Sequence, residues 1–166
     1  MTDPVRRVRV ERNRLRFAAA HMATFGGDCE PLHGHNYDVF IEVEGELSDE
    51  SWIIDFGLVK RLAHEICEQL DHHFLLQQNS SLLRAQQFEG SWVLTCGARE
   101  YRLPSSDVVV LPIANSTTEQ LSEWFHGQLS AELRRREIEN VRRLCIGVEE
   151  MPGQAAWYAA DIAGSG

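Results

Sequence analysis

The order of hydrophobic periodicities along the chain predicts an α+β domain. Apolar and polar residues alternate at about 5–22 and 32–47, helical spacing follows in two stretches, and alternation returns at about 141–150 and 154–160. Side chains repeat every second residue on a strand and about every 3.6 residues on a helix, so the patterns separate the two kinds of element. The chain has 166 residues, enough for one real core. We expect a single domain over residues 1–166.

The first two strands are expected to form an antiparallel pair. Gly26 and Gly27 reverse the chain between them. On the first strand the apolar register ends at His21, and on the second it begins at His33 and His35. The pairing would therefore place three imidazoles on the buried face, close to one another.

These histidines favour a metal site. A buried imidazole is costly unless something binds it, and neutral imidazole is a good zinc ligand. Each histidine alone is better explained as a satisfied core or surface residue, but His21, His33 and His35 together indicate Zn²⁺. Three protein ligands leave a tetrahedral zinc ion an open position, which is typical of catalytic sites. His64 and His126 have no identifiable partners and are expected at the surface.

The two helices have recognisable starts. Asp55 is placed as the N-cap of a helix that ends near Leu70. Ser116-Thr117-Thr118-Glu119 fits a capping box at the start of the second helix, which continues to about Leu133. Between the helices, residues of about 80–111 read as a hairpin insertion.

Charge and hydropathy exclude some functions. The net charge of −9 argues against a general affinity for nucleic acid, because neutralising phosphates needs a basic surface. No apolar stretch approaches the roughly 18 residues of a membrane span. The N-terminus lacks the apolar core of a signal peptide, so we expect a cytoplasmic protein that does not bind membranes.

The four cysteines form no C-x-x-C pair, so we predict neither a zinc ribbon nor a disulfide framework. Cys29 lies in a polar loop four residues before His33, where a free thiol would reach both solvent and the metal. A neighbouring histidine or metal lowers the pKa of a thiol from its usual ~8.5. Cys29 is therefore a candidate base or nucleophile, and the alternative is an incidental loop thiol.

Two carboxylates need an explanation. Asp71 follows the first helix, where the helix dipole disfavours negative charge, and it could orient His72 as a proton acceptor for a thiol. The alternative is that His72 or His73 only complements the helix C-terminus. Glu150 continues the inward register of the strand at 141–150 and could accept paired N–H groups from a heterocycle, unless the strand end frays into water.

Several motifs follow one another along nearly the whole chain: Phe17-Ala18-Ala19-Ala20-His21, Cys29-Glu30-Pro31-Leu32-His33-Gly34-His35-Asn36-Tyr37, Asp55-Phe56, Leu70-Asp71-His72, Ser116-Thr117-Thr118-Glu119, and Val148-Glu149-Glu150 with Tyr158. In content and order these motifs resemble the 6-pyruvoyltetrahydropterin synthase family, which includes 6-carboxy-5,6,7,8-tetrahydropterin synthase of the queuosine pathway. The chain departs from the family pattern in its insertion and at three positions where bacterial relatives often have Pro, Asn and Thr: Ser116, Gln120 and Met151.

The resemblance implies a T-fold: a four-stranded antiparallel sheet with two helices on one face. It implies a homo-oligomer, a trimer or a hexamer of stacked trimers, with active sites between subunits. The substrate would be 7,8-dihydroneopterin triphosphate, bound through its side chain to zinc. The resemblance implies that the metal is bound by His21, His33 and His35. It implies that Cys29 abstracts the proton, with Asp71 and His72 of the same or a neighbouring subunit as its relay. Glu150, Thr117 and Thr118 would bind the substrate, and Glu119 either binds substrate or only completes the capping box.

Our leading hypothesis is a zinc-dependent carbon–oxygen lyase that forms 6-carboxy-5,6,7,8-tetrahydropterin and releases triphosphate and acetaldehyde. The sequence around Cys29 and Glu30 resembles bacterial members of that branch. The first alternative is the pyruvoyl-forming reaction. The second is a folate-pathway, aldolase-like form in which a glutamate is the base, for which Glu30 is available. The third is a non-catalytic zinc protein that binds a pterin or a partner.

Overall fold

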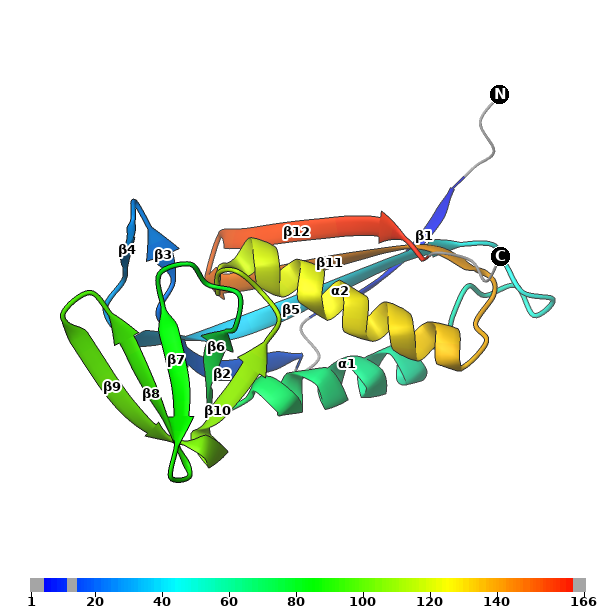
Figure 1. Cartoon of the computed structure of the whole chain (residues 1–166). Coiled ribbons are helices and arrows are strands. Elements are labelled where there is room, and N and C mark those ends of the chain that lie inside the picture. The colour runs from blue at the N-terminus through cyan, green and yellow to red at the C-terminus, as the bar shows by residue number, and fades with distance from the viewer. Residues whose placement is uncertain (1–4, 12–14, 163–166) are drawn as a thin grey trace.

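The computed structural model describes residues 5–11 and 15–162 and confirms the α+β class. Helices α1 (Phe56–Leu70) and α2 (Thr118–Arg135) pack on one face of a large curled sheet (Figure 1). The sheet contains β1 (Arg6–Val10), β2 (Arg16–His21), β5 (His33–Gly45), β6 (His73–Gln77), β10 (Val108–Leu111), β11 (Val141–Met151) and β12 (Gln154–Asp161). None of the helices in the described part of the chain is long and apolar enough to cross a membrane.

The sheet is larger than the expected four antiparallel strands. Its order is β10-β6-β2-β5-β11-β12, and β1 also pairs with β5. The strands β2, β5, β11 and β12 are antiparallel, as expected, but β6 and β10 add a parallel edge. The strand expected over 5–22 is two separate strands, β1 and β2, and residues 12–14 between them lie outside the described part. The prediction missed β6 and β10 because short apolar runs show no alternation.

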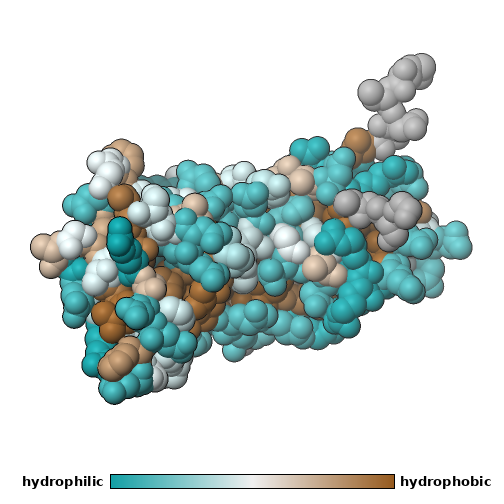
Figure 2. Space-filling view, in the orientation of Figure 1, coloured by the Kyte–Doolittle hydropathy of each residue, from teal (hydrophilic) through white to brown (hydrophobic). Residues whose placement is uncertain are grey.

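The insertion is also larger than a hairpin. It forms a three-stranded sheet of β7 (Arg84–Phe88), β8 (Ser91–Cys96) and β9 (Arg99–Pro104), and the short 3₁₀ helix η1 (Ser105–Asp107) leads on to β10. In Figure 2, hydrophobic residues gather where this inserted sheet meets the rest of the molecule. A second apolar cluster lies in this region: Met22, Cys29, Phe74, Leu76, Leu83, Leu94, Cys96 and Val108.

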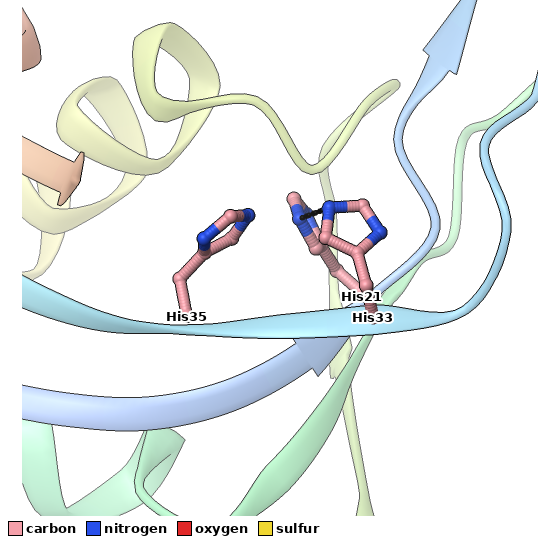
Figure 3. Close-up of side chains that lie close together, drawn as sticks. All are labelled: His21, His33 and His35. Carbon is pink, nitrogen blue, oxygen red and sulfur yellow. Dashed lines mark hydrogen bonds between the residues drawn. The ribbon is translucent and has the colours of Figure 1, made fainter.

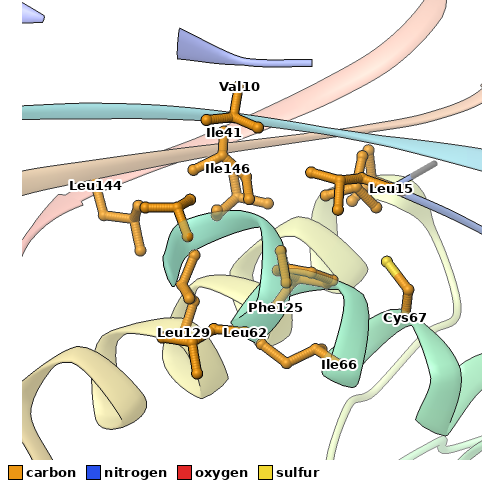
Figure 4. Close-up of a cluster of buried hydrophobic side chains, with 14 of the residues drawn as sticks. Val10, Leu15, Ile41, Leu62, Ile66, Cys67, Phe125, Leu129, Leu144 and Ile146 are labelled. Atoms are coloured by element: carbon orange, nitrogen blue, oxygen red, sulfur yellow. The ribbon is translucent and has the colours of Figure 1, made fainter. Parts of the chain in front are cut away.

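The main core lies between the sheet and the two helices (Figure 4). Alternate residues of β5, from Tyr37 to Val43, face the helices and are buried. The apolar stripe predicted for α1, from Val59 to Leu70, is buried against them. Asp55 caps α1 as predicted, since its carboxylate oxygens accept hydrogen bonds from the N–H groups of Gly57 and Leu58 at 2.8 and 3.2 Å.

Two expectations about α2 are wrong. The capping box does not form: Thr117 is the N-cap, its side chain makes no capping hydrogen bond, and Ser116 is buried one residue earlier. His126 is buried rather than at the surface, because it packs against Tyr158 with a ring separation of 5.0 Å and lies 3.3 Å from the carbonyl oxygen of Ala160. Both differences arise from contacts between elements that are distant in sequence.

Candidate metal centre

The pairing of β2 with β5 brings three histidines together. His21 lies opposite His33, and Ala19 lies opposite His35, so all three imidazoles project from the same side of the sheet. One ring nitrogen of each histidine can be chosen so that all three lie within 4.8 Å of one another. Figure 3 shows the rings gathered above the two strands. The predicted convergence of the three histidines is confirmed.

Hydrogen bonds to backbone carbonyls orient two of the rings. Nδ1 of His21 donates to the carbonyl oxygen of Ser116 at 2.9 Å, and Nδ1 of His33 donates to that of Pro31 at 2.7 Å. Because a carbonyl oxygen can only accept, each Nδ1 carries a proton, so in the neutral ring that a metal binds each Nε2 carries the lone pair. The buried Ser116 thus serves the histidine site through its carbonyl rather than capping α2.

The two lone pairs lie close enough to need a cation. Nε2 of His21 is 3.1 Å from Nε2 of His33, and no proton is left to join them. A tetrahedral zinc ion with bonds of about 2.0–2.1 Å needs ligand nitrogens about 3.3 Å apart. The spacing and tautomers of His21 and His33, with His35 in the same cluster, fit a zinc ion, and the two outer hydrogen bonds are of the kind that orient metal-bound histidine.

His21 is held neutral, as a metal ligand must be. Burial is the main reason that its pKa falls to about 4, and the nearby His33 and His35 lower it further, although the bond to the Ser116 carbonyl opposes this. The hydroxyl of buried Tyr37 lies 3.4 Å from both ring nitrogens of His21. The pKa of Tyr37 is raised, mainly by burial, so this hydroxyl stays protonated.

The histidines line a cavity of about 320 Å³ that also holds three carboxylates. Glu30, Glu119 and Glu150 belong to its wall, and Oε2 of Glu30 lies 3.7 Å from Nε2 of His33. The start of α2 contributes Thr117 and Thr118, two of the predicted substrate-binding residues. The structure therefore gathers Glu150, Thr117, Thr118 and Glu119 around the three histidines.

Cys29 does not present a free thiol to this cavity. It lies in the short hairpin of β3 (Thr24–Phe25) and β4 (Asp28–Cys29), and its sulfur forms a disulfide with Cys96 of the inserted sheet. Only 3% of Cys29 is exposed. The expectation of a solvent-reaching thiol, and of no disulfide, is wrong in this structure. Neighbouring side chains of an extended segment point to opposite sides, so Cys29 faces the insertion while Glu30 faces the histidines.

Asp71 and His72 form a hydrogen-bonded pair outside this cavity. Oδ2 of Asp71 lies 2.7 Å from Nδ1 of His72, and Oδ1 accepts the N–H of Ala18 at 2.7 Å. The Ala18 bond first, and His72 next, hold the pKa of Asp71 below its usual range. His72 has a φ of 58° and lines a different cavity of about 500 Å³ with Ala18, Gly34 and Leu103. Of the three clustered histidines, His35 also lines this second cavity, but His21 and His33 do not, so within one subunit the pair does not share a cavity with the whole cluster.

Glu30 lies on the cavity wall, although the sequence pointed to it only as the base of the aldolase-like alternative and not of the leading hypothesis. The sequence feature that could have identified Glu30 is its position, three residues before His33 and directly after Cys29. On an extended segment the side chains of Cys29 and Glu30 point in opposite directions. The disulfide directs Cys29 away from the metal site and so leaves Glu30 facing it. Its partner, Cys96, lies 67 residues away in the sequence.

Comparison with known proteins identifies the family and supports the fold. The chain matches the family model described as 6-pyruvoyl tetrahydropterin synthase over residues 10–161. It is 30% identical to a Methanocaldococcus jannaschii protein provisionally named 6-carboxy-5,6,7,8-tetrahydropterin synthase, covering 87% of this chain and 89% of that one. The crystal structure of 6-pyruvoyl tetrahydropterin synthase from Plasmodium vivax shares 33% identity and a TM-score of 0.89, covering 96% of this chain and 99% of that one. The chain therefore belongs to the 6-pyruvoyl tetrahydropterin synthase family of lyases.

Proposed function

We propose that this protein is a zinc-dependent carbon–oxygen lyase that converts 7,8-dihydroneopterin triphosphate to 6-carboxy-5,6,7,8-tetrahydropterin, releasing triphosphate and acetaldehyde. The observation that carries the proposal is the meeting of three imidazoles with free lone pairs in a cavity walled by carboxylates. The name of the M. jannaschii relative supports the carboxy-forming reaction, and that product is the one consumed in queuosine synthesis.

His21, His33 and His35 would hold the zinc ion. When bound, zinc supplies a Lewis acid that polarises oxygens of the substrate side chain and acidifies its hydroxyl groups. Glu150, on the cavity wall, would accept two N–H groups of the pterin ring and so fix the ring's orientation. The hydroxyl groups of Thr117 and Thr118, and the carboxylate of Glu119, would complete the substrate contacts at the start of α2.

Glu30 replaces Cys29 as the proposed base. With its sulfur bonded to Cys96, Cys29 has no thiol to accept a proton. Glu30 lies on the cavity wall beside His33 and can accept the side-chain proton of the substrate. A Plasmodium vivax 6-pyruvoyltetrahydropterin synthase structure in which a glutamate is changed to alanine is described as a catalytic-residue mutant, which supports a carboxylate base in this family.

Asp71 and His72 are proposed to act in the site of a neighbouring subunit. His72 is 83% exposed at its side chain, and it does not line the cavity that holds all three histidines of its own subunit. A trimer, or a hexamer of stacked trimers, would give such a surface pair a catalytic partner, as the family resemblance implies.

A second candidate is the aldolase-like reaction with a glutamate base. The disulfide of Cys29 and the position of Glu30 favour it more than the sequence did, since its cysteine-free mechanism needs only a carboxylate. It would cleave a carbon–carbon bond and leave a dihydropterin that keeps one side-chain carbon. The pyruvoyl-forming reaction, supported by the names of the Plasmodium structures, is the third.

One experiment separates these reactions. Zinc-loaded protein is incubated with 7,8-dihydroneopterin triphosphate, and all products are read by mass spectrometry. Carboxytetrahydropterin with acetaldehyde supports the proposal. Pyruvoyltetrahydropterin alone, or a dihydropterin with a one-carbon side chain, assigns the chain to one of the other reactions. Tight zinc binding without any product would make it a non-catalytic pterin or partner-binding protein.

A further inference from the structure

The inserted sheet is bonded to the short segment that carries Glu30. The tip of the β8–β9 hairpin runs from Cys96 to Arg99, and both of these residues bond to β4. Cys96 holds the sulfur of Cys29, and the guanidinium of Arg99 donates to the backbone carbonyl of Cys29 and lies 3.0 Å from Oδ1 of Asp28. In Figure 1 the β3–β4 hairpin lies beside this sheet.

Apart from these bonds, the segment is held mainly at its start, where the side chain of Asn115 makes two hydrogen bonds with the backbone of Thr24. The β3–β4 hairpin has only two residues in each strand, and its turn at Gly26 and Gly27 has φ values of 60° and 87°. Asp28 is 74% exposed, so its ion pair with Arg99 is itself weak. The stronger restraints are the buried disulfide and the bond from Arg99 to the Cys29 carbonyl.

The restraint is transmitted to Glu30 through one peptide unit. The carbonyl group of Cys29 is held by Arg99, and the N–H of Glu30 donates to the carbonyl of Ala23 at 2.8 Å. These two groups belong to the same peptide bond, which is planar, so its orientation is set from both ends. The carboxylate of Glu30 then stands on the wall of the cavity, 3.7 Å from His33.

We propose that Cys96 and Arg99 are positioning residues through which the inserted sheet holds the Glu30 carboxylate at the histidine cavity. These two residues and Cys29, to which both are bonded, form what we call the clamp. The proposal rests on the proposed function for the role of Glu30 as base, but not for the clamp itself. A dithiol reductant would open the clamp: the S–S bond takes two electrons and two protons, Cys29 and Cys96 become thiols, and the dithiol becomes a disulfide.

The first test counts thiols. Alkylation of the denatured protein without reductant should modify Cys67 and Cys145, and alkylation after reduction should modify all four cysteines. Modification of Cys29 or Cys96 in the unreduced protein overturns the proposal, because the clamp would not be closed.

The second test uses Cys96→Ser, with Cys145→Ser as the matched control, since Cys145 is free and lies on β11 away from the cavity. We expect faster hydrogen exchange over residues 24–32 in Cys96→Ser, unchanged zinc content, and kcat lower by about tenfold at a nearly unchanged KM, because a displaced base affects the chemical step more than binding. Cys145→Ser should match the wild type in all of these.

Substitutions of Arg99 test whether it positions Glu30 through its hydrogen bond or only contributes to stability. Arg99→Ala should lower kcat in the same way, and Arg99→Lys should recover part of it because an ammonium group can still donate to the Cys29 carbonyl. Equal activity of Arg99→Ala and wild type, with equal exchange over residues 24–32, overturns the proposal.

Failure of the clamp and failure of the proposed function give different results. If the wild type makes no product, the function is wrong, but hydrogen exchange and zinc content still decide the clamp. If Cys96→Ser is fully active and Cys29→Ser is inactive in the presence of dithiothreitol, the thiol of Cys29 is the base and the clamp proposal is overturned.

Discussion

At the scale of single residues, the metal centre depends on which nitrogen of each imidazole carries the proton. The carbonyl groups of Ser116 and Pro31 accept hydrogen bonds from the Nδ1–H groups of His21 and His33, and in the neutral rings this leaves two Nε2 lone pairs 3.1 Å apart. Such an arrangement is repulsive until a cation lies between the nitrogens. The same carbonyl groups therefore select the tautomers and prepare the site for zinc.

Removing one ligand should remove the metal. We expect His33→Ala to lower zinc affinity by at least about 100-fold, since two histidines cannot complete a zinc site. Zinc content after dialysis, measured by mass spectrometry of the metal, checks this. His64→Ala is the control because His64 is exposed on α1 and is no part of the cluster; equal loss of zinc in both variants would contradict the assignment.

Acid should destabilise the zinc-free protein through His21. Its folded pKa of about 4 lies below the unfolded value of 6.5, so the unfolded state binds the proton more readily. The stability from neutral His21 is present above pH 6.5 and is lost as the pH falls from 6.5 to about 4, by roughly 3 kcal/mol. Urea denaturation of the zinc-free protein at several pH values measures this loss.

The control for this pH dependence is His21→Gln, which has no group that titrates at the position. Its stability should fall less between pH 6.5 and 4 than that of the wild type. An equal fall in the two proteins would mean that burial of His21 is not its cause.

At the scale of elements, β2 and β5 approach closely where they carry the histidines. A Cβ atom at Gly34 would lie 2.8 Å from the carbonyl oxygen of Ala19, which is backbone and cannot turn away. Gly34 stands between His33 and His35, so this glycine lets the two strands pair at the spacing that the three imidazoles need.

Gly34→Ala should therefore disturb both the sheet and the metal centre. We expect a loss of about 1–3 kcal/mol in the free energy of unfolding and weaker zinc binding. Gly127→Ala is the matched control: Gly127 is exposed on α2, a Cβ there meets nothing within 4 Å, and the change should stabilise the protein by roughly 1 kcal/mol. Denaturant titrations of both variants, with zinc content, test the contrast.

Local sequence patterns were sufficient to predict some of the elements. The alternation in β5 and the cap at Asp55 depend on neighbours in sequence, and both were predicted. The capping box at Ser116 does not form, because both the hydroxyl and the carbonyl of Ser116 contact His21, 95 residues away, and the helix begins after Thr117. Strands β6 and β10 were missed because their place in the sheet depends on pairing with distant strands.

At the scale of the whole molecule, the proposed catalytic groups are divided between two cavities. All three histidines and the glutamates line one, and His72 lines the other, which His35 also borders but His21 and His33 do not. If subunits assemble so that one cavity meets the neighbour's Asp71–His72 pair, every active site contains parts of two chains. Light scattering coupled to gel filtration should then give the mass of a trimer or a hexamer.

Mixed oligomers test this division. His72→Ala and His33→Ala are each expected to be inactive, but subunits mixed at equal amounts after unfolding and refolding should recover about a quarter of the wild-type rate, as random pairing combines one intact triad with one intact neighbour. Mass spectrometry shows whether mixed oligomers have formed. If they have formed and no activity is recovered, then either one subunit supplies both the histidines and His72 to each site, or His72 takes no part in the reaction.

The sequence by itself determined the α+β class, the two helices and the inward register that carries His21, His33 and His35, because each of these follows from periodicity within a single segment. Only the tertiary structure decided that Cys29 bonds to Cys96, that Glu30 faces the cavity in its place, and that Asp71 and His72 stand apart from it. Those outcomes depend on contacts between residues far apart along the chain. Local periodicity cannot encode such contacts, since it reports only the direction of side chains on one element.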